Sequence, residues 1–169
     1  SPNAATTTSD RLVSLQGAGQ MTSGSLRVAD GNFSGTLGGT SSFIKEGGGL
    51  LVLTGNHTFT GASAIHAGTV QVGNGGTTGA LGAASIAHSG VLAFNRSDAA
   101  SWAGSLSGTG TLTKSGANTL TVTGTLTHTG GTTISGGMLQ IGDGGTAGSL
   151  NGGTVTNAGT IRFNRSDAS

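Results

Sequence analysis

The strongest constraint on the fold is a long, gapless internal repeat, in which residues 43–94 return as residues 112–163. Matching pairs, all separated by the same offset, include Lys45 and Lys114, Gly55 and Gly124, and Gln71 and Gln140. Each copy consists of short runs of β-type residues separated by glycines. Such a repeat is typical of a solenoid, in which each unit buries its apolar face only against its neighbours.

The composition favours an ordered, all-β chain with glycine at its corners. The 169 residues include 35 glycines and one proline, and 33% of the residues are hydrophobic. The apolar residues alternate with polar ones, and helical periodicity is absent. We therefore predict a parallel β-helix with about three coils per 69-residue repeat. Coils of about 23 residues, stacked about 4.8 Å apart, would divide at residues 42–61, 62–82 and 83–108.

Charge and cysteine content exclude several kinds of partner. The formal net charge is +1, and the seven basic residues are spread along the chain. No basic stripe is available for a nucleic-acid backbone or an anionic membrane. No apolar run is long enough for a transmembrane helix, so we expect no nucleic-acid partner and no direct membrane insertion. The absence of cysteine excludes disulfides and thiolate metal sites.

We expect one folded unit preceded by a short tail. Residues 1–10 are small and polar and predict a flexible tail or linker. Residues 11–169 form a single β-helix fragment, with repeat copies at about 42–110 and 111–169 and a partial copy at about 20–41. Because the sequence stops inside a third unit, we expect it to be a piece of a longer protein.

Comparison of the two copies predicts which side chains face the core. Leu51 and Leu53 remain aliphatic in the second copy, whereas Leu50 and Val52 become threonines. The same test assigns to the core Phe43, Ile65, Val70, Val72, Ile86, Leu92, Phe94, Leu37 and their counterparts Leu112, Ile134, Leu139, Ile141, Val155, Ile161, Phe163 and Leu106. Expected strands cover residues 42–46, 50–54, 57–60, 63–67, 69–73, 85–89, 91–95 and 101–106. Val91 and Ala93 are expected outside the core.

No constellation of catalytic or metal-binding residues is evident. The histidines have no companions, and His57 and His128 are expected to be half-buried or exposed structural residues. The acidic residues never form a local pair, although a polysaccharide-acting β-helix needs clustered carboxylates or a calcium site. We therefore assign no catalytic, cofactor-binding or metal-binding residue and expect no enzymatic activity. Binding residues stay unassigned.

Two glycine-rich segments, at residues 73–76 and 142–145, superficially resemble a calcium-binding nonapeptide or a phosphate loop. The calcium motif repeats at every ninth position, however, and a phosphate loop needs a lysine and a following helix. We expect glycine corners with positive φ instead. Arg96 with Asp98, and the equivalent pair in the second copy, Arg165 with Asp167, are expected to form surface ion pairs near a corner. An ice-binding threonine ladder is disfavoured, because the first copy has Leu50 and Val52 in place of threonine.

The second copy resembles a known repeat. The segments LTKSGANTLTVTG, ending at Gly124, and TTISGGMLQIG, ending at Gly142, resemble the autotransporter-associated β-strand repeat, also called the passenger-associated transport repeat. The resemblance extends from about Gly35 onward, and the first copy departs from it at Glu46 and His66. It implies a right-handed parallel β-helix in the passenger of a Gram-negative type V secreted protein. The repeat itself carries no catalytic residues to transfer.

The resemblance implies a structural or interaction role. Family members are commonly adhesins, aggregation factors or cytotoxins, carried out by a β-barrel translocator that is covalently linked and outside this segment. The first hypothesis is a surface-exposed or secreted β-helical stalk that supports export, adhesion or self-association. Its partners would be a host-cell or bacterial surface receptor, or a second copy. The alternatives are a fragment of a β-helical polysaccharide-acting enzyme and an effector or toxin passenger that binds a host receptor.

Overall fold

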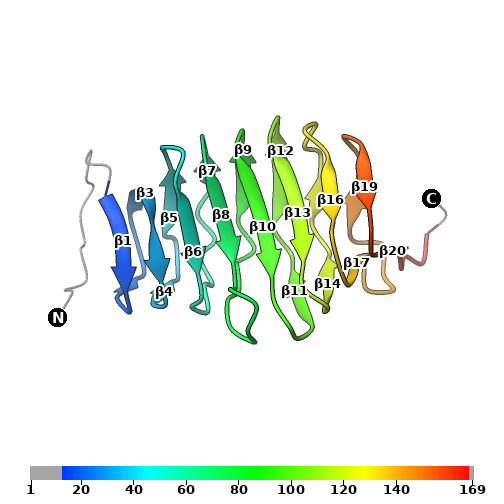
Figure 1. Cartoon of the computed structure of the whole chain (residues 1–169), viewed down its shortest axis with the longest axis horizontal. Helices are drawn as coiled ribbons and strands as arrows, with labels where there is room; N and C mark the ends of the chain where they lie inside the picture. Colours follow the sequence, from blue (N-terminus) through cyan, green and yellow to red (C-terminus); the bar gives the residue numbers. More distant parts are fainter. Residues whose placement is uncertain (1–12, 168–169) are drawn as a thin grey trace.

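The chain forms a parallel β-solenoid of about seven coils (Figure 1). The computed structural model describes residues 13–167, so the tail predicted at residues 1–10 and the start of order at Arg11 lie outside the described residues. Every strand pairing in the described part is parallel, and no helix occurs there that could span a membrane. The predicted all-β parallel architecture is confirmed.

Each coil has three sides, and strands on one side stack along the long axis of the molecule. Side one contains β5 (Ser42–Lys45), β7 (Ser63–Ile65), β9 (Ser85–His88), β12 (Ser105–Gly108), β15 (Thr125–Leu126) and β18 (Ser149–Leu150). Side two contains β6 (Leu50–Leu53), β8 (Thr69–Val72), β10 (Val91–Asn95), β13 (Thr111–Ser115), β16 (Thr132–Ile134) and β19 (Val155–Asn157). Side three contains β11 (Ala100–Trp102), β14 (Thr119–Val122), β17 (Met138–Ile141) and β20 (Thr160–Phe163).

The first coils are less regular. The strands there are β1 (Val13–Gly17), β2 (Gln20–Met21), β3 (Ser25–Phe33) and β4 (Thr36–Leu37). The long strand β3 pairs with β5 through its first half and with β6 through its last residues, which joins sides one and two into one sheet. The strand predicted at residues 57–60 is not formed; an isolated bridge between Asn56 and Ala80 takes its place. The strand predicted at residues 101–106 is two strands, β11 and β12, separated by a corner at Gly104.

One repeat is three coils plus one further side. Along side one, Lys45 pairs with Ile65, Ile65 with His88, and His88 with Gly108, and the step from Ile65 to His88 is longer than the steps before and after it. Lys114, the counterpart of Lys45, lies beyond Gly108 on β13 of side two. The estimate of about three coils per repeat therefore holds, but the expectation of a uniform coil length is wrong. The third predicted coil, at residues 83–108, runs one side too far.

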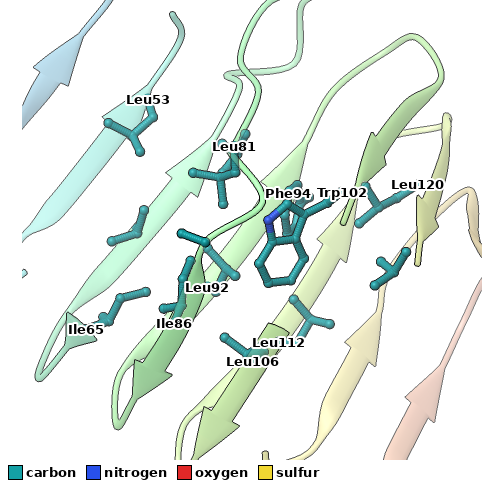
Figure 2. Packing of buried hydrophobic residues seen from close by; sticks show 14 of the residues in the cluster. Leu53, Ile65, Leu81, Ile86, Leu92, Phe94, Trp102, Leu106, Leu112 and Leu120 are labelled. Atoms are coloured by element: carbon teal, nitrogen blue, oxygen red, sulfur yellow. The ribbon is translucent and has the colours of Figure 1, made fainter. Parts of the chain in front are cut away.

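A continuous apolar column fills the interior (Figure 2). The predicted inward residues are buried through most of the molecule, and Phe94 packs beside Trp102 with ring centroids 5.6 Å apart. Ala93 was expected outside the core but is buried. Val155 and Phe163 were expected in the core but are exposed, because β19 and β20 pair with β16 and β17 on one side and no described strand stacks on their other side.

Candidate functional site: a clamped loop and groove in each copy

The described residues contain no cluster typical of an active site. No group of three or more histidine, cysteine, aspartate or glutamate side chains between residues 13 and 167 could hold a metal ion. Glu46 forms an ion pair with Arg27 and lies 3.7 Å from the Nδ1 of the exposed His66. The features that both copies share are instead a glycine loop, a groove beside it and a buried lysine.

The glycine loop of the first copy is tied to the next coil. The amide of Gly75 donates a hydrogen bond to the carbonyl oxygen of Asn95 at 2.9 Å. The amide of Ser97 donates a hydrogen bond to the carbonyl oxygen of Gly76 at 3.0 Å. Gly73 and Gly75 have φ values of 78° and 91°, which confirms the predicted glycine corner. The loop extends beyond the ends of the strands after β8 (Figure 1), and its backbone contacts make it an extension of the coil stack.

The second loop repeats these contacts. The amide of Gly144 donates to the carbonyl oxygen of Asn164 at 2.8 Å, and the amide of Ser166 donates to that of Gly145 at 3.0 Å. Gly142 and Gly144 likewise have positive φ values, 85° and 102°. Equivalent sequences therefore form equivalent loops at two different corners of the solenoid.

An arginine clamps the first loop. The Nε of Arg96 donates to Oδ1 of Asp98 at 2.9 Å, and its Nη2 donates to both carboxylate oxygens at 2.7 and 2.8 Å. The same guanidinium donates to the carbonyl oxygen of Thr77 at 2.7 Å and to that of Gly79. The predicted ion pair is confirmed, and its arginine also closes the base of the loop, which the sequence analysis missed.

The second copy builds a similar clamp from Arg165, in which the contact of Arg96 with the carbonyl of Thr77 has no counterpart among the described residues. Its Nε donates to Oδ1 of Asp167 at 2.8 Å, and its Nη1 donates to the carbonyl oxygen of Gly148. The hydrogen bond between the two side chains raises the pKa of Arg165 and lowers the pKa of Asp167. Each side chain therefore favours the charged form of its partner.

A groove runs beside each clamped loop. The first has a volume of about 330 Å³ and is lined by Thr54, Asn56, Thr77, Thr78, Gly79, Ala80 and Arg96. The second has a volume of about 550 Å³ and is lined by Thr123, Thr125, Thr146, Ala147, Gly148, Ser149, Asn151 and Arg165. Each lining position of the first groove has its counterpart at the equivalent position of the second copy. The groove is thus a property of the repeat.

The two grooves open on different edges of the solenoid. The first lies where side two turns into side three, between β8 and the segment that contains the Asn56–Ala80 bridge. The second lies where side three turns into side one, between β14 and β15 and between β17 and β18. This displacement follows directly from the extra side in each repeat.

Lys45 and Lys114 are completely buried, which the sequence analysis did not predict. The Nζ of Lys45 donates to the carbonyl oxygens of Glu46, Gly47 and Ala67 at 3.1, 2.7 and 3.3 Å. Three carbonyls satisfy the three donors of an ammonium group. Burial lowers the pKa of Lys45, an effect that the charge of Asp30 partly offsets.

Lys114 occupies the same arrangement on side two. Its Nζ donates to the carbonyl oxygens of Ser115, Gly116 and Gly136 at 2.9, 3.0 and 3.3 Å, and burial lowers its pKa. In the first copy, a Cβ on Gly68 would lie 2.7 Å from the Nζ of Lys45 and 2.4 Å from the carbonyl oxygen of Gly49. The lysine cage therefore requires glycine at the facing turn, where φ is +69°.

His57 and His128 are buried, contrary to the expected exposed or half-buried positions, and His88 is buried as well. Nδ1 of His57 accepts a hydrogen bond from the amide of Leu37 at 3.1 Å, and its ring stacks on Phe33 with centroids 5.7 Å apart. Burial lowers the pKa of His57 to about 4. The expectation failed because side chains alternate between inward and outward here even without a regular strand, so that His57 points inward together with Phe59.

His88 and His128 face each other inside the column. Their ring centroids are 5.5 Å apart, and Gly108, which lies next to His88 in the ladder, has no side chain to separate them. Nε2 of His128 lies 3.0 Å from the hydroxyl oxygen of Thr132. Burial lowers the pKa of both histidines, that of His88 to about 4 with a further contribution from the neighbouring His128. This pair places two polar imidazole groups within the apolar core.

Comparison with known proteins agrees with these repeats. The passenger-associated-transport-repeat family model matches residues 43–72 and 112–141. Over 91 residues, or 52% of the chain, the sequence is 44% identical to an adhesin BmaC autotransporter from Brucella suis biovar 1 (strain 1330). The chain spans only 3% of the length of that relative. No solved structure matches the chain. The β-solenoid therefore carries two passenger-associated transport repeats, and over about half of its length the chain is similar to an autotransporter adhesin.

Proposed function

We propose that this segment is a non-enzymatic stalk that contributes to adhesion at the surface of a Gram-negative bacterium. The observation that carries the proposal is the coincidence of two transport repeats with similarity to an adhesin autotransporter. A passenger is surface-exposed or secreted, and a covalently linked β-barrel translocator elsewhere in the same protein would export this one. Its partner would be a host-cell or bacterial surface receptor, or a second copy.

The solenoid also suits an export role. Because each coil buries its apolar side chains against the preceding coil, folding can propagate coil by coil as the chain emerges. Leu120, Val122 and Ile141 are fully buried on side three and belong to the matched second repeat. Their place in the column makes them sensitive reporters of this stacking.

The export role is tested by replacing Leu120, Val122 and Ile141 with aspartate in the full-length protein. A buried, unpaired carboxylate disrupts stacking, so the amount of passenger displayed on intact cells should fall. The matched control replaces the outward residues Thr119, Thr121 and Gln140 with aspartate and should leave display unchanged. Unchanged display of the core variant, measured by antibody labelling, would contradict the proposal.

The adhesive role needs a separate experiment. A non-adherent strain that displays the full-length protein should bind host cells or form aggregates more than the same strain with an empty vector. Deletion of residues 11–169 should reduce that binding if the segment contributes to it. Binding that is equal with and without the segment, at equal surface display, would remove the adhesive part of the proposal.

A further inference from the structure

We propose that the two grooves are equivalent binding sites for a neutral, hydroxyl-rich ligand, that is, a saccharide. This inference rests on the proposed adhesive function and names the chemical class of its ligand. The first groove is formed around Thr54, Asn56 and Thr77, and the second around Thr123, Thr125 and Thr146.

The threonines that line the grooves, together with Asn56, are free to bind. In the part of the chain that the structure describes, no intramolecular hydrogen bond uses the side chains of Thr54, Asn56, Thr77 or Thr78. Hydroxyl groups donate and accept hydrogen bonds, and an amide does both through separate atoms. Sugar hydroxyls require this mixture of donors and acceptors. The second groove offers Thr123, Thr125 and Thr146 in the same unoccupied state.

The grooves offer no free charge to an anion. All three guanidinium nitrogens of Arg96 already donate to Asp98 or to the carbonyl oxygens of Thr77 and Gly79. Arg165 is neutralised in the same way by Asp167. The arginines therefore shape the groove walls, and the exposed chemistry selects for a neutral ligand over a phosphate or a carboxylate.

Size and rigidity are consistent with a small saccharide. Ligand pockets commonly have volumes of about 300–1,000 Å³, and both grooves fall within that range. The clamp and the backbone hydrogen bonds hold each loop before a ligand arrives, which lowers the entropic cost of binding. No aromatic side chain lines either groove, so we expect weak binding at each single site, with a Kd of about 1–10 mM.

The displacement of the grooves determines how they act together. Because they open on different edges, a flat surface can contact one groove and leave the other facing away. Two small saccharides should bind independently, one to each groove. A flexible polysaccharide that passes around the solenoid could occupy both and gain affinity through effective concentration.

The test is a nuclear magnetic resonance titration of the ¹⁵N-labelled 169-residue chain with lactose, mannobiose or cellobiose. We expect saturable shift changes at the amides of residues 77–79 and 146–148 with at least one disaccharide. Binding of lactose or mannobiose would indicate an animal-cell glycan, and binding of cellobiose a bacterial polysaccharide. No saturable change at either loop with any of the three at 50 mM would overturn the proposal.

Matched variants locate the sites. Thr54→Val removes one hydroxyl from the first groove and should weaken binding there about fivefold, while the second groove is unchanged; Thr123→Val should do the reverse. Thr133→Val alters an exposed threonine on β16, outside both grooves, and should change neither. Unchanged thermal unfolding shows that each variant is folded. Shift changes that neither groove variant affects would refute the assignment.

A double variant that combines Thr54→Val with Thr123→Val separates this proposal from the adhesive function. If displaying cells adhere equally well with Thr54→Val and Thr123→Val combined, and the purified chain binds no saccharide, the saccharide sites are refuted and the adhesive function stands. If the purified chain binds saccharide but displaying cells adhere no better than control cells, the adhesive function is refuted and the sites stand.

Discussion

The two copies of the repeat have nearly the same local structure on different sides of the solenoid. Lys45 lies on side one and Lys114 on side two, yet each ammonium group is bound by three carbonyl oxygens at matching positions. The clamped loops are likewise equivalent although they occupy different corners. Local sequence therefore determines turns, cages and clamps, independently of the side on which they fall.

The copies differ in how deeply their equivalent side chains are buried. Phe94 is 4% exposed between neighbouring coils, whereas its counterpart Phe163 on β20 is 57% exposed. Ile86 and Val155 show the same contrast. An equivalent inward-facing residue is thus buried only where coils stack on both sides of it, as expected for a one-dimensional array.

The largest expected effect comes from truncating the buried phenylalanine, and truncation of its exposed counterpart provides the comparison. Phe94→Ala should lower the free energy of unfolding by about 3–5 kcal/mol, because it deletes a buried ring and leaves a cavity. Phe163→Ala should cost less than about 1 kcal/mol, as is usual for exposed positions. Equilibrium unfolding in guanidinium chloride measures both. Equal losses would show that stacking does not determine the difference.

Lowering the pH should destabilise the fold through His57, a residue of the first copy whose counterpart in the second copy is Leu126. The folded pKa of His57 is about 4, below the ordinary value of 6.5, so the unfolded chain takes up the proton first. Stability is complete above pH 6.5 and falls as the pH decreases toward 4, by about 3 kcal/mol for such a group. The pKa of His88 is also lowered to about 4, so this histidine adds to the same loss of stability.

The test replaces His57 with leucine, the residue that the second copy has at the equivalent position. His57→Leu should lower the free energy of unfolding at pH 7 by about 1–2 kcal/mol, because the amide of Leu37 loses its acceptor. It should also reduce the difference in stability between pH 7 and pH 4.5. Denaturant unfolding at the two pH values gives both quantities. An unchanged pH dependence would mean that His57 does not contribute to acid sensitivity.

The two lysine cages should respond equally to mutation. Lys45→Met or Lys114→Met keeps most of the apolar stem and removes the ammonium group, which leaves three carbonyl oxygens without their donor. Each substitution should lower the free energy of unfolding by about 1–3 kcal/mol. Chemical denaturation of the two variants in parallel provides the comparison. Losses that differ by more than about twofold would show that the side of the solenoid matters.

The smallest effect is expected at the loop clamp. Asp98→Asn weakens the carboxylate contact of Arg96 and should cost less than about 1 kcal/mol, as is usual for partly exposed ion pairs. Hydrogen exchange should nevertheless become faster at the amides of Gly75 and Ser97, which join the loop to the next coil. The untouched second loop serves as the internal control. Faster exchange in both loops would indicate global destabilisation instead of a local clamp.

Much of the fold was predictable from the alternation of residues, but coil length was not. Inward and outward positions such as Leu51 and Leu50 follow strand parity, which the duplicate made visible. Coil length depends on where corners fall, and Gly104 divides a run that resembles a single strand. The assumption that one repeat equals a whole number of coils led to the incorrect uniform coil length.

The candidate site was only partly predictable. The glycine corners and the Arg96–Asp98 pair follow from residue types, whereas the contacts of the guanidinium with loop carbonyls depend on the next coil. The buried lysines had a detectable signal: Lys45 shares the strand parity of the inward Phe43 and is identical in both copies. Charged residues are seldom fully buried without partners, and the carbonyl partners of Lys45 come from turns that no strand pattern reveals.

The extra side in each repeat unit has a consequence for how such a chain can lengthen. Tandem duplication does not need to preserve whole turns, because a parallel ladder accepts any neighbour whose corner spacing matches. Each successive unit would then lie one edge further around the solenoid, and after three units, or about ten coils, a fourth would regain the orientation of the first. Growth by duplication thus arranges identical features in a spiral around a straight rod.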